Sequence, residues 1–291
     1  MHDLLPIPPN TVTTGFTTSL HLANDVEALA FVALADDALG VHKSSSRLPH
    51  PLVTPPKPPP SQGRDRPVAW EAFYPKGSIN PSNPIPGGCG FYLSGPKAFS
   101  DAFVNAKEVV MSYEVLFEEG FEWVKGGKLP GMFGGIGDLA YRCSGGRKDN
   151  RCKCFDLRLM WRQSGQGELY AYLPLTPTNA SRLLEVPSSK QNPDYGFSVG
   201  RGLFNFRAGE WTTVAQRVKL NDIGHENGEV EVYINGISVI RVAGLTLRDE
   251  AASYVKGMHF QTFFGGSSPD WASPKDQKAW FAGVTGALLK D

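Results

Sequence analysis

This sequence lacks three features: a transmembrane segment, a basic net charge and a visible signal peptide. It contains no run of about 18 apolar residues, so no transmembrane helix is expected. The 29 basic and 29 acidic residues balance to a net charge of zero, which removes any general attraction to nucleic acid or anionic membranes. The opening MHDLLPIPPNTVTTGF lacks a basic segment followed by an apolar one, so no signal peptide is visible. Affinity for an anionic ligand must therefore come from a local group of cations.

Cysteine is also scarce, with four residues in 291. Zinc sites usually contain CxxC pairs, and one CxC with two distant cysteines and no nearby histidine fits that pattern poorly. Disulfides are the better interpretation, and they favour an oxidising compartment, so we expect a secreted protein. We expect Cys143 to bond Cys154, which leaves Cys89 for Cys152, although the sequence alone does not settle this pairing.

Composition divides the chain into three segments. Residues 1–43 form an N-terminal extension in which the apolar pattern of 19–42 predicts one amphipathic helix. Residues 44–67 hold so many prolines that we expect a semi-rigid linker without regular structure. Residues 68–291 consist of short β-type runs separated by Gly, Pro and Asn. This texture predicts an all-β sandwich or jelly-roll domain.

The stretch CFDLRLMWRQSGQGELYAYLP, residues 154–174, predicts a hairpin with two unlike faces. Side chains alternate along a strand, so one apolar face suits a core. The other face carries Asp156, Arg158, Met160, Arg162, Glu168, Tyr170 and Tyr172. Centring the turn on Gly165 pairs Arg158 with Tyr172, and a slip of two residues would keep the same groups on the same face. Arg162 and Glu168 would meet near the turn as an exposed pair of little energetic worth.

Several longer strings point to a family. In chain order they are WEAFYPKGSINPS (70–82), GGCGFYLSGP (87–96), GGKLPG (126–131), CSGG (143–146), RLMWR (158–162) with YAYLP (170–174), and FFGGSSPDWASPKD (263–276). This series resembles polysaccharide lyase family 14, and within it the fungal members, over residues 68–289. Residues 1–67 lie outside the resemblance.

The resemblance implies a β-jelly roll whose concave sheet forms a cleft for an acidic polysaccharide, which is cleaved by β-elimination. It also implies the catalytic residues. The lysine of the KLPG motif is Lys128, the arginine is Arg158, and the tyrosine pair is Tyr170 and Tyr172. Where the family has a serine this chain has Asp156, whose carboxylate would repel a uronate unless a cation such as Arg158 is paired with it. Substrate preference can therefore differ from that of the alginate-cleaving members.

Elimination from a uronic acid needs three functions at one site. The guanidinium of Arg158 is always charged and can bind a carboxylate through two N–H groups, which neutralises the carboxylate and makes the C5 proton more acidic. Tyr170 and Tyr172 can remove this proton or protonate the leaving O4, if cations such as Lys128 lower a phenol pKa from about 10. The same cations stabilise the enolate-like charge of the transition state. This arrangement requires no metal or other cofactor, and the sequence does not indicate calcium.

Each candidate also has an ordinary structural interpretation. A lone lysine in a Gly- and Pro-rich loop, as expected for Lys128, is usually just solvated. Asp156 either orients Arg158 or contacts the substrate directly. His259 is more often a satisfied core histidine than a proton shuttle, and Gln261, which alternates with it, could hydrogen-bond sugar hydroxyls. The substrate-binding candidates are therefore Asp156, Arg162, Gln261 and His259.

Three functions compete on this sequence. The leading one is a secreted, monomeric polyuronate lyase that leaves unsaturated uronyl ends on alginate, glucuronan or a glucuronic-acid-bearing heteropolymer. A non-catalytic carbohydrate-binding module on the same fold is the main alternative, but it has no use for a Lys, an Arg and two Tyr on one face. A glycoside hydrolase needs two carboxylates about 5–9.5 Å apart, whereas Asp156 and Glu168 lie several pairs apart. The expected partner is an anionic polysaccharide, and neither nucleic acid nor a membrane.

Overall fold

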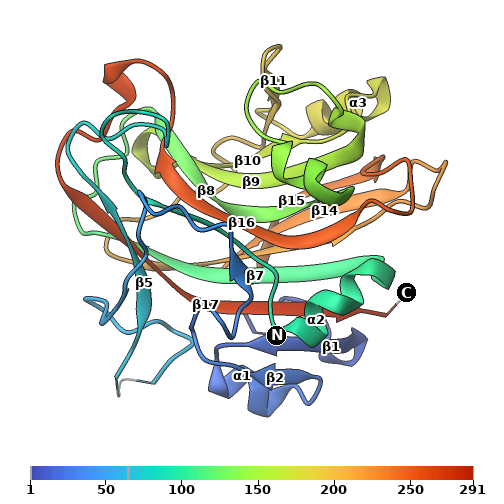
Figure 1. Cartoon of the computed structure of the whole chain (residues 1–291), viewed down its shortest axis with the longest axis horizontal. Coiled ribbons are helices and arrows are strands. Elements are labelled where there is room, and N and C mark those ends of the chain that lie inside the picture. Colours follow the sequence, from blue (N-terminus) through green and yellow to red (C-terminus); the bar gives the residue numbers. More distant parts are fainter. Residues whose placement is uncertain (1, 64–65, 291) are drawn as a thin grey trace.

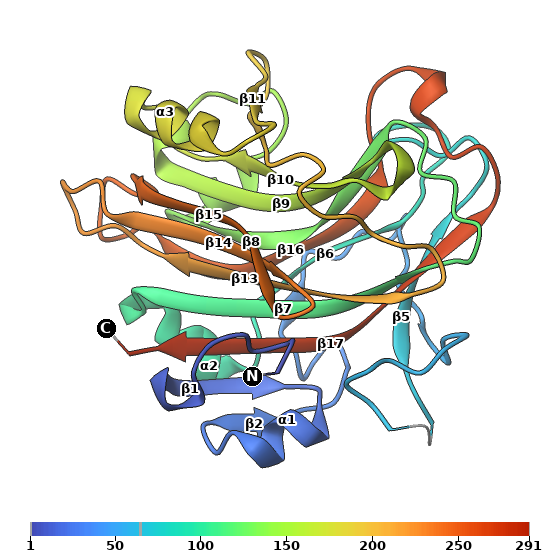
Figure 2. The same cartoon turned by 180° about the vertical axis from the view of Figure 1, so that it is seen from behind.

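The computed structural model describes residues 2–63 and 66–290, and its strands form two sheets stacked face to face (Figures 1 and 2). Within these residues one sheet has nine strands and the other has eight. The all-β jelly roll expected from the sequence is therefore confirmed. No helix in this part of the chain is long and apolar enough to cross a membrane.

The nine-stranded sheet runs in the order β15-β14-β13-β7-β17-β1-β2, with β5 paired to β17 and β4 paired to β5. Only β1 and β2 are parallel among these pairs. The strands are β1 (Val12–Thr17), β2 (Leu29–Phe31), β4 (Leu52–Val53), β5 (Ala69–Tyr74), β7 (Glu108–Phe117), β13 (Trp211–Lys219), β14 (Gly228–Ile234), β15 (Ile237–Leu245) and β17 (Gln277–Leu289).

The eight-stranded sheet is antiparallel and runs in the order β11-β12-β10-β9-β8-β16-β6-β3. Its strands are β3 (Val41–His42), β6 (Cys89–Leu93), β8 (Gly126–Gly135), β9 (Cys154–Arg162), β10 (Gly167–Tyr172), β11 (Lys190–Gln191), β12 (Phe197–Val199) and β16 (Tyr254–Phe264). This sheet carries every candidate catalytic residue.

Helices are short and lie in the connections. The α-helices are α1 (Leu20–Asp25), α2 (Lys97–Ala102) and α3 (Pro177–Glu185). The 3-10 turns are η1 (Pro9–Thr11), η2 (Phe103–Asn105), η3 (Gly137–Arg142), η4 (Arg151–Lys153), η5 (Gln163–Gly165) and η6 (Pro269–Trp271). Of these, η3 and η4 belong to the connection that leads from β8 into β9.

Alternate residues of facing strands fill the space between the two sheets. On β7 the odd-numbered side chains from Val109 to Phe117 enter the main core, and on β9 those from Phe155 to Trp161 do the same. Fully burying one such side chain contributes about 1.5–3 kcal/mol. Because one face of each sheet is used in this way, the other face of the eight-stranded sheet is left to carry a site.

The predicted helix over residues 19–42 is wrong. α1 ends at Asp25, and the chain then forms β2 and β3, which join different sheets. Leu29 packs in a cluster beside β1 and β17, whereas Leu34 and Leu39 pack into the main core. One straight helix cannot serve both burial sites, so tertiary packing overrides the local helical pattern.

Residues 44–63, 66 and 67 have almost no regular structure, as their prolines predict, but they are bonded to the nine-stranded sheet. The backbone N–H and the hydroxyl of Ser61 bind the carboxyl group of Glu114 on β7, at 2.9 and 2.5 Å. Burial raises the pKa of Glu114 to about 7. The division into an extension, a linker and a domain that begins at residue 68 stays a prediction, and β1 to β4 show that the preceding residues add strands to both sheets.

One of the two predicted disulfides is present. Cys143 and Cys154 form a disulfide, with their Cα atoms 5.7 Å apart. The second predicted bond is wrong, because Cys89 and Cys152 are both free. Cys89 is buried in the core on β6 and Cys152 is exposed at η4, so their thiols lie in different environments.

Glu114 gives the fold a pH dependence of predictable sign. Its carboxyl keeps a proton in the folded chain up to about pH 7, whereas the unfolded chain loses it near pH 4.3. The folded state therefore loses about 3 kcal/mol of stability as the pH rises through this window. Urea unfolding at pH 5 and pH 8 should show a smaller loss in Glu114→Gln than in the wild type. Glu119→Gln, at an exposed position, is the control, and equal losses in all three proteins would contradict the assignment.

Reduction of the Cys143–Cys154 disulfide should lower the thermal midpoint. The bond joins residues 11 apart in sequence, and closing a loop of that size is worth about 3 kcal/mol. Thermal unfolding with and without a reductant measures the effect. The Cys152→Ser variant, which removes only a free thiol, should respond to the reductant as the wild type does, and an unchanged wild-type midpoint would count against a stabilising bond.

Candidate active site

The predicted polar face of the hairpin lies on the side of the eight-stranded sheet that points away from the core. The apolar face of β9 and β10 is part of the main core, as alternation predicts. On the opposite face Asp156, Arg158, Tyr170 and Tyr172 are each at most 6% exposed. A buried polar face of this kind is unusual, because burying charged groups costs free energy unless they are paired.

The register of the hairpin differs by two residues from the prediction. Tyr170 pairs with Arg158, and Tyr172 pairs with Asp156. The reason is the turn, which is centred on Ser164, a residue in the left-handed conformation with φ 58°, instead of on Gly165. A slip of two residues is one full period of a strand, so the same side chains still share one face.

Lys128 lies on β8 and not in the loop that the sequence suggested. A bulge at Pro130 shifts the register of β8 against β9 between Leu129 and Gly131. The extra residue lets the even-numbered Lys128 and the odd-numbered Gly131 meet the same face of the neighbouring strand, opposite Met160 and Arg158. The KLPG motif therefore acts through its proline, which brings the lysine into the site.

One row of paired residues crosses the site. It runs over five strands, β10, β9, β8, β16 and β6, and consists of Tyr170, Arg158, Gly131, His259 and Tyr92. Only glycine fits the middle position, because a Cβ atom there would lie 2.0 Å from the carbonyl oxygen of Leu157. The row therefore has no side chain between those of Arg158 and His259.

Arg158 is held by backbone and amide oxygens. Its Nη1 donates to Oε1 of Gln261 at 3.1 Å, its Nη2 donates to the Gln261 carbonyl at 2.8 Å, and its Nε points at the Leu129 carbonyl at 3.5 Å. These contacts use three of the five N–H groups of a guanidinium, so two remain for a ligand. Gln261 thus orients Arg158, and its predicted contact with sugar hydroxyls stays a prediction.

Lys128 is 8% exposed and lies against the tyrosine pair. Its Nζ is 3.6 Å from the ring centroid of Tyr170, 5.2 Å from that of Tyr172, and 3.2 Å from Sδ of Met160. Burial, together with the positive charge of Arg158, holds the pKa of Lys128 well below its usual value. The lysine therefore loses its proton more readily than a solvated one.

The tyrosines do not have the lowered pKa that the sequence analysis expected. Burial raises the pKa of both phenols above the usual value, and this effect outweighs the lowering by Arg158 at Tyr172 and by Arg162 at Tyr170. Their ring centroids are 5.3 Å apart. Both phenols therefore carry their protons at neutral pH and are suited to donate one.

Asp156 is paired with His259. One of its two predicted roles was to orient Arg158 through an ion pair, and in the described residues that ion pair does not form. Its Oδ2 lies 2.9 Å from Nδ1 of His259, while its buried Oδ1 has no hydrogen-bond partner in the described residues. The imidazole stacks on Tyr92, with ring centroids 4.4 Å apart and planes 16° apart. Burial lowers the pKa of His259, with Asp156 acting in the opposite direction. His259 is thus neither a lone core histidine nor a solvated one.

The predicted pair of Arg162 and Glu168 forms, but it is not exposed. Glu168 is fully buried, and its carboxylate binds Nη2 of Arg162 at 2.5 Å, Nε of Arg201 at 2.7 Å and the hydroxyl of Ser198 at 2.7 Å. Although burial acts to raise it, these partners bring the pKa of Glu168 below its usual value. Removing one partner of such a buried network is strongly destabilising.

Sequence reasoning missed Tyr92, Arg201 and Arg151. The guanidinium of Arg151, in the disulfide-bonded loop, lies 5.1 Å from the ring centroid of Tyr172. It donates to the backbone oxygens of Gly145 and Tyr195, both at 3.3 Å, so it ties together two loops beside that tyrosine. The cluster of basic residues between positions 142 and 153 was a signal that could have directed attention to this loop.

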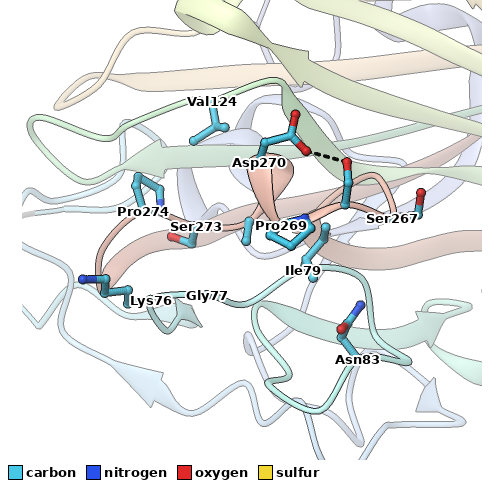
Figure 3. Close-up of a pocket in the computed structure, with 12 residues that line it drawn as sticks. Lys76, Gly77, Ile79, Asn83, Val124, Ser267, Pro269, Asp270, Ser273 and Pro274 are labelled. Atoms are coloured by element: carbon cyan, nitrogen blue, oxygen red, sulfur yellow. Dashed lines mark hydrogen bonds between the residues drawn. The ribbon is translucent and has the colours of Figure 1, made fainter.

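A cavity of about 450 Å³ lies at one end of this sheet, where β16 ends and β8 begins (Figure 3). Its lining comes from residues 76–83, from Val124 and from residues 267–274, and the labelled side chains include Lys76, Ile79, Asn83 and Asp270. The carboxylate of Asp270 is bound by Ser268 and by Lys125. None of the four predicted catalytic residues lines it.

The described residues offer no ready-made metal site. Across residues 2–63 and 66–290, no group of three or more His, Cys, Asp or Glu side chains is placed to hold a metal ion. The donor set of the site, a lysine, an arginine and two protonated phenols, is cationic or neutral. That chemistry suits an anionic ligand better than a cation.

Comparison with known proteins agrees with this geometry. The model of the family Polysaccharide lyase 14 matches residues 63–284. A solved PL-14 alginate lyase from Aplysia kurodai is 29% identical, with a TM-score of 0.72 over 96% of this chain and 99% of that one. The alginate lyase vAL-1 from Chlorella virus is 22% identical, with a TM-score of 0.62 over 87% and 93%. The alginate lyase Aly36B, solved with an alginate trisaccharide, is 20% identical, with a TM-score of 0.58 over 76% and 82%.

No curated protein matches this sequence. The family match covers more than half of the chain, and the solved structures share the two-sheet fold. Three of the strings that carried the resemblance, GGKLPG, RLMWR and YAYLP, lie on or directly after the site strands β8, β9 and β10. The chain therefore belongs to polysaccharide lyase family 14.

Proposed function

We propose that this protein cleaves a uronic-acid-containing polysaccharide by β-elimination. One observation carries the proposal. Arg158 and Lys128 are both buried, yet no carboxylate in the described residues lies within salt-bridge distance of either. A buried charge without a partner is costly, and the lowered pKa of Lys128 reflects that cost. The carboxylate of a uronate would supply the missing partner.

The proposed reaction has three parts. The two free N–H groups of Arg158 bind the uronate carboxylate and stabilise the negative charge that develops when the C5 proton leaves. The electron pair of the C5–H bond forms the C4=C5 double bond, and the C4–O4 bond breaks. A protonated tyrosine then gives its proton to O4. We assign this role to Tyr170, which pairs with Arg158 and has Lys128 against its ring.

The remaining polar groups suggest how the sugar is held. The unpartnered Oδ1 of Asp156 can accept a hydrogen bond from a sugar hydroxyl, and the guanidinium of Arg162, 5.9 Å from the ring centroid of Tyr170, places positive charge beside that phenol. The relatives named above are alginate lyases, so alginate is the first substrate to test, followed by glucuronan and heteropolymers that contain glucuronic acid. We also propose that the protein is a secreted monomer that needs no metal.

The two other functions explain the site less well. A carbohydrate-binding module would not need protonated phenols beside unpaired buried cations. A glycoside hydrolase needs a carboxylic acid that holds a proton at working pH. Glu168 cannot serve, because its pKa is lowered and its oxygens are bound by two arginines.

A panel of uronans should separate these functions. Incubation with alginate, glucuronan and a glucuronic-acid heteropolymer should give products with the ultraviolet absorbance of an unsaturated uronyl end on at least one of them. Replacement of Arg158 with Ala should abolish that signal while the far-ultraviolet circular dichroism stays unchanged. Leu159→Met, a swap on the core face of the same strand, should cost less than about 1.5 kcal/mol and keep the activity. Binding to a uronan without any unsaturated product would favour the binding module.

The corrected register changes which tyrosine matters more. Tyr170→Phe removes the proton donor while keeping the ring against Lys128, so kcat should fall by about 10²–10⁴-fold. Tyr172→Phe should cost less, because Tyr172 pairs with Asp156 and lies farther from Lys128. Initial rates on the best uronan of the panel measure both losses. A larger loss in Tyr172→Phe would show that the other phenol is the acid.

A further inference from the structure

The pair formed by Asp156 and His259 has a defined protonation pattern. Oδ2 of Asp156 lies 2.9 Å from Nδ1 of His259, and an ionised carboxylate can only accept a hydrogen bond. Beside an ionised carboxylate, the neutral imidazole takes the tautomer that has its hydrogen atom on Nδ1. Nε2 is left with a lone pair and is the ring nitrogen that can take up a proton.

The position of the pair relates it to Arg158 and Tyr170. His259 lies in the row that contains both, two strands from Arg158, with only Gly131 between them. Tyr170 lies one strand from Arg158 on the other side. A uronate held by Arg158 would therefore have the phenol on one flank and the imidazole on the other.

The surroundings keep the imidazole oriented and neutral. The ring stacks on Tyr92 of β6, which fixes its plane. The charged groups that face it are Asp156 and Arg158 on β9 and Lys128 on β8. Burial and the two cations lower the pKa of His259, against the effect of Asp156, so the ring is free of the second proton at neutral pH.

Lys128 is the other group that could act as a base, but it lies on the same side of Arg158 as the proposed acid, Tyr170. Its Nζ touches the ring of Tyr170 and Sδ of Met160. A base is needed where it can reach C5 while the acid reaches O4. The imidazole provides a proton acceptor that is separate from the phenol, whereas the lysine does not.

We propose that His259 is the base of the elimination and that Asp156 is the residue that positions it. In this step Nε2 of His259 takes the C5 proton, the C5–H electron pair becomes the C4=C5 double bond, and O4 leaves with the proton of Tyr170. Solvent afterwards removes the proton from the imidazolium and returns one to the phenolate. The inference rests on the proposed function. It gives Asp156, which stands where the family has a serine, a role particular to this chain.

The test compares three variants of the full chain on the uronan that the wild type cleaves best. His259→Gln should lower kcat by about 10²–10⁴-fold. Asp156→Asn, which can offer an N–H to Nδ1 and so favour the wrong tautomer, should lower kcat as well. His225→Gln changes an exposed histidine elsewhere and should keep the wild-type rate.

The pH profile separates a base from a merely structural residue. In the wild type kcat/KM should fall on the acid side as His259 gains its second proton, with an apparent pKa below the ordinary value of about 6.5. His259→Gln should lose this acid limb, whereas Lys128→Met should retain it at a lower rate. Nitrogen-15 spectra of the histidine rings give a readout that needs no substrate, and they should show hydrogen on Nδ1 of His259 and none on Nε2.

The outcomes distinguish this inference from the proposed function. If His259→Gln keeps the acid limb and a near-normal rate, or if Nε2 carries the hydrogen, the base is another group and only this inference fails. If the wild type forms no unsaturated product on any uronan of the panel, the proposed function fails and takes the base assignment with it.

Discussion

The site depends on burying two basic side chains, Arg158 and Lys128, without a carboxylate within salt-bridge distance of either in the described residues. Arg158 is kept in place by the amide and backbone oxygens of Gln261, which hold the guanidinium without cancelling its charge. Lys128 has an aromatic face and a thioether beside it in place of a carboxylate. The free energy that this arrangement costs must come from the rest of the fold, and it is recovered when an anionic sugar binds.

Several features of the fold hold the site residues in place and offset that free-energy cost. The core between the two sheets packs against the apolar faces of β9 and β10, which anchors the strands that carry the site. The bulge at Pro130 turns Lys128 into the site, and Gly131 allows the backbone of β8 to approach that of β9 closely beside Arg158. Beside them the network around Glu168 fixes one edge. These supports are the packed core, the bulge and close approach of the β8 backbone, and a buried network of ion pairs.

Alternation along residues 154–174 was enough to predict which side chains share the site face, because the period of a strand does not depend on its partner. The pairing within that hairpin could not be predicted, since it depended on Ser164 adopting a left-handed conformation. Lys128 was identified only through a family motif, because the bulge that orients it breaks the simple period. The contact between Asp156 and His259 joins residues 103 apart in sequence, and nothing local predicts it. The helix expected over 19–42 failed for a related reason, since its apolar residues serve two separate clusters.

The charges, the phenols and the imidazole are all explained by elimination, and water has no part in breaking the glycosidic bond by that route. Cleavage in water enriched in heavy oxygen tests this most directly, with mass spectrometry of the oligosaccharides formed. The account predicts that each cut yields one product lighter by a molecule of water, with an unsaturated ring and no heavy oxygen introduced at the cut. Products that carry heavy oxygen at the new chain end and lack the unsaturated ring would show hydrolysis and contradict the account.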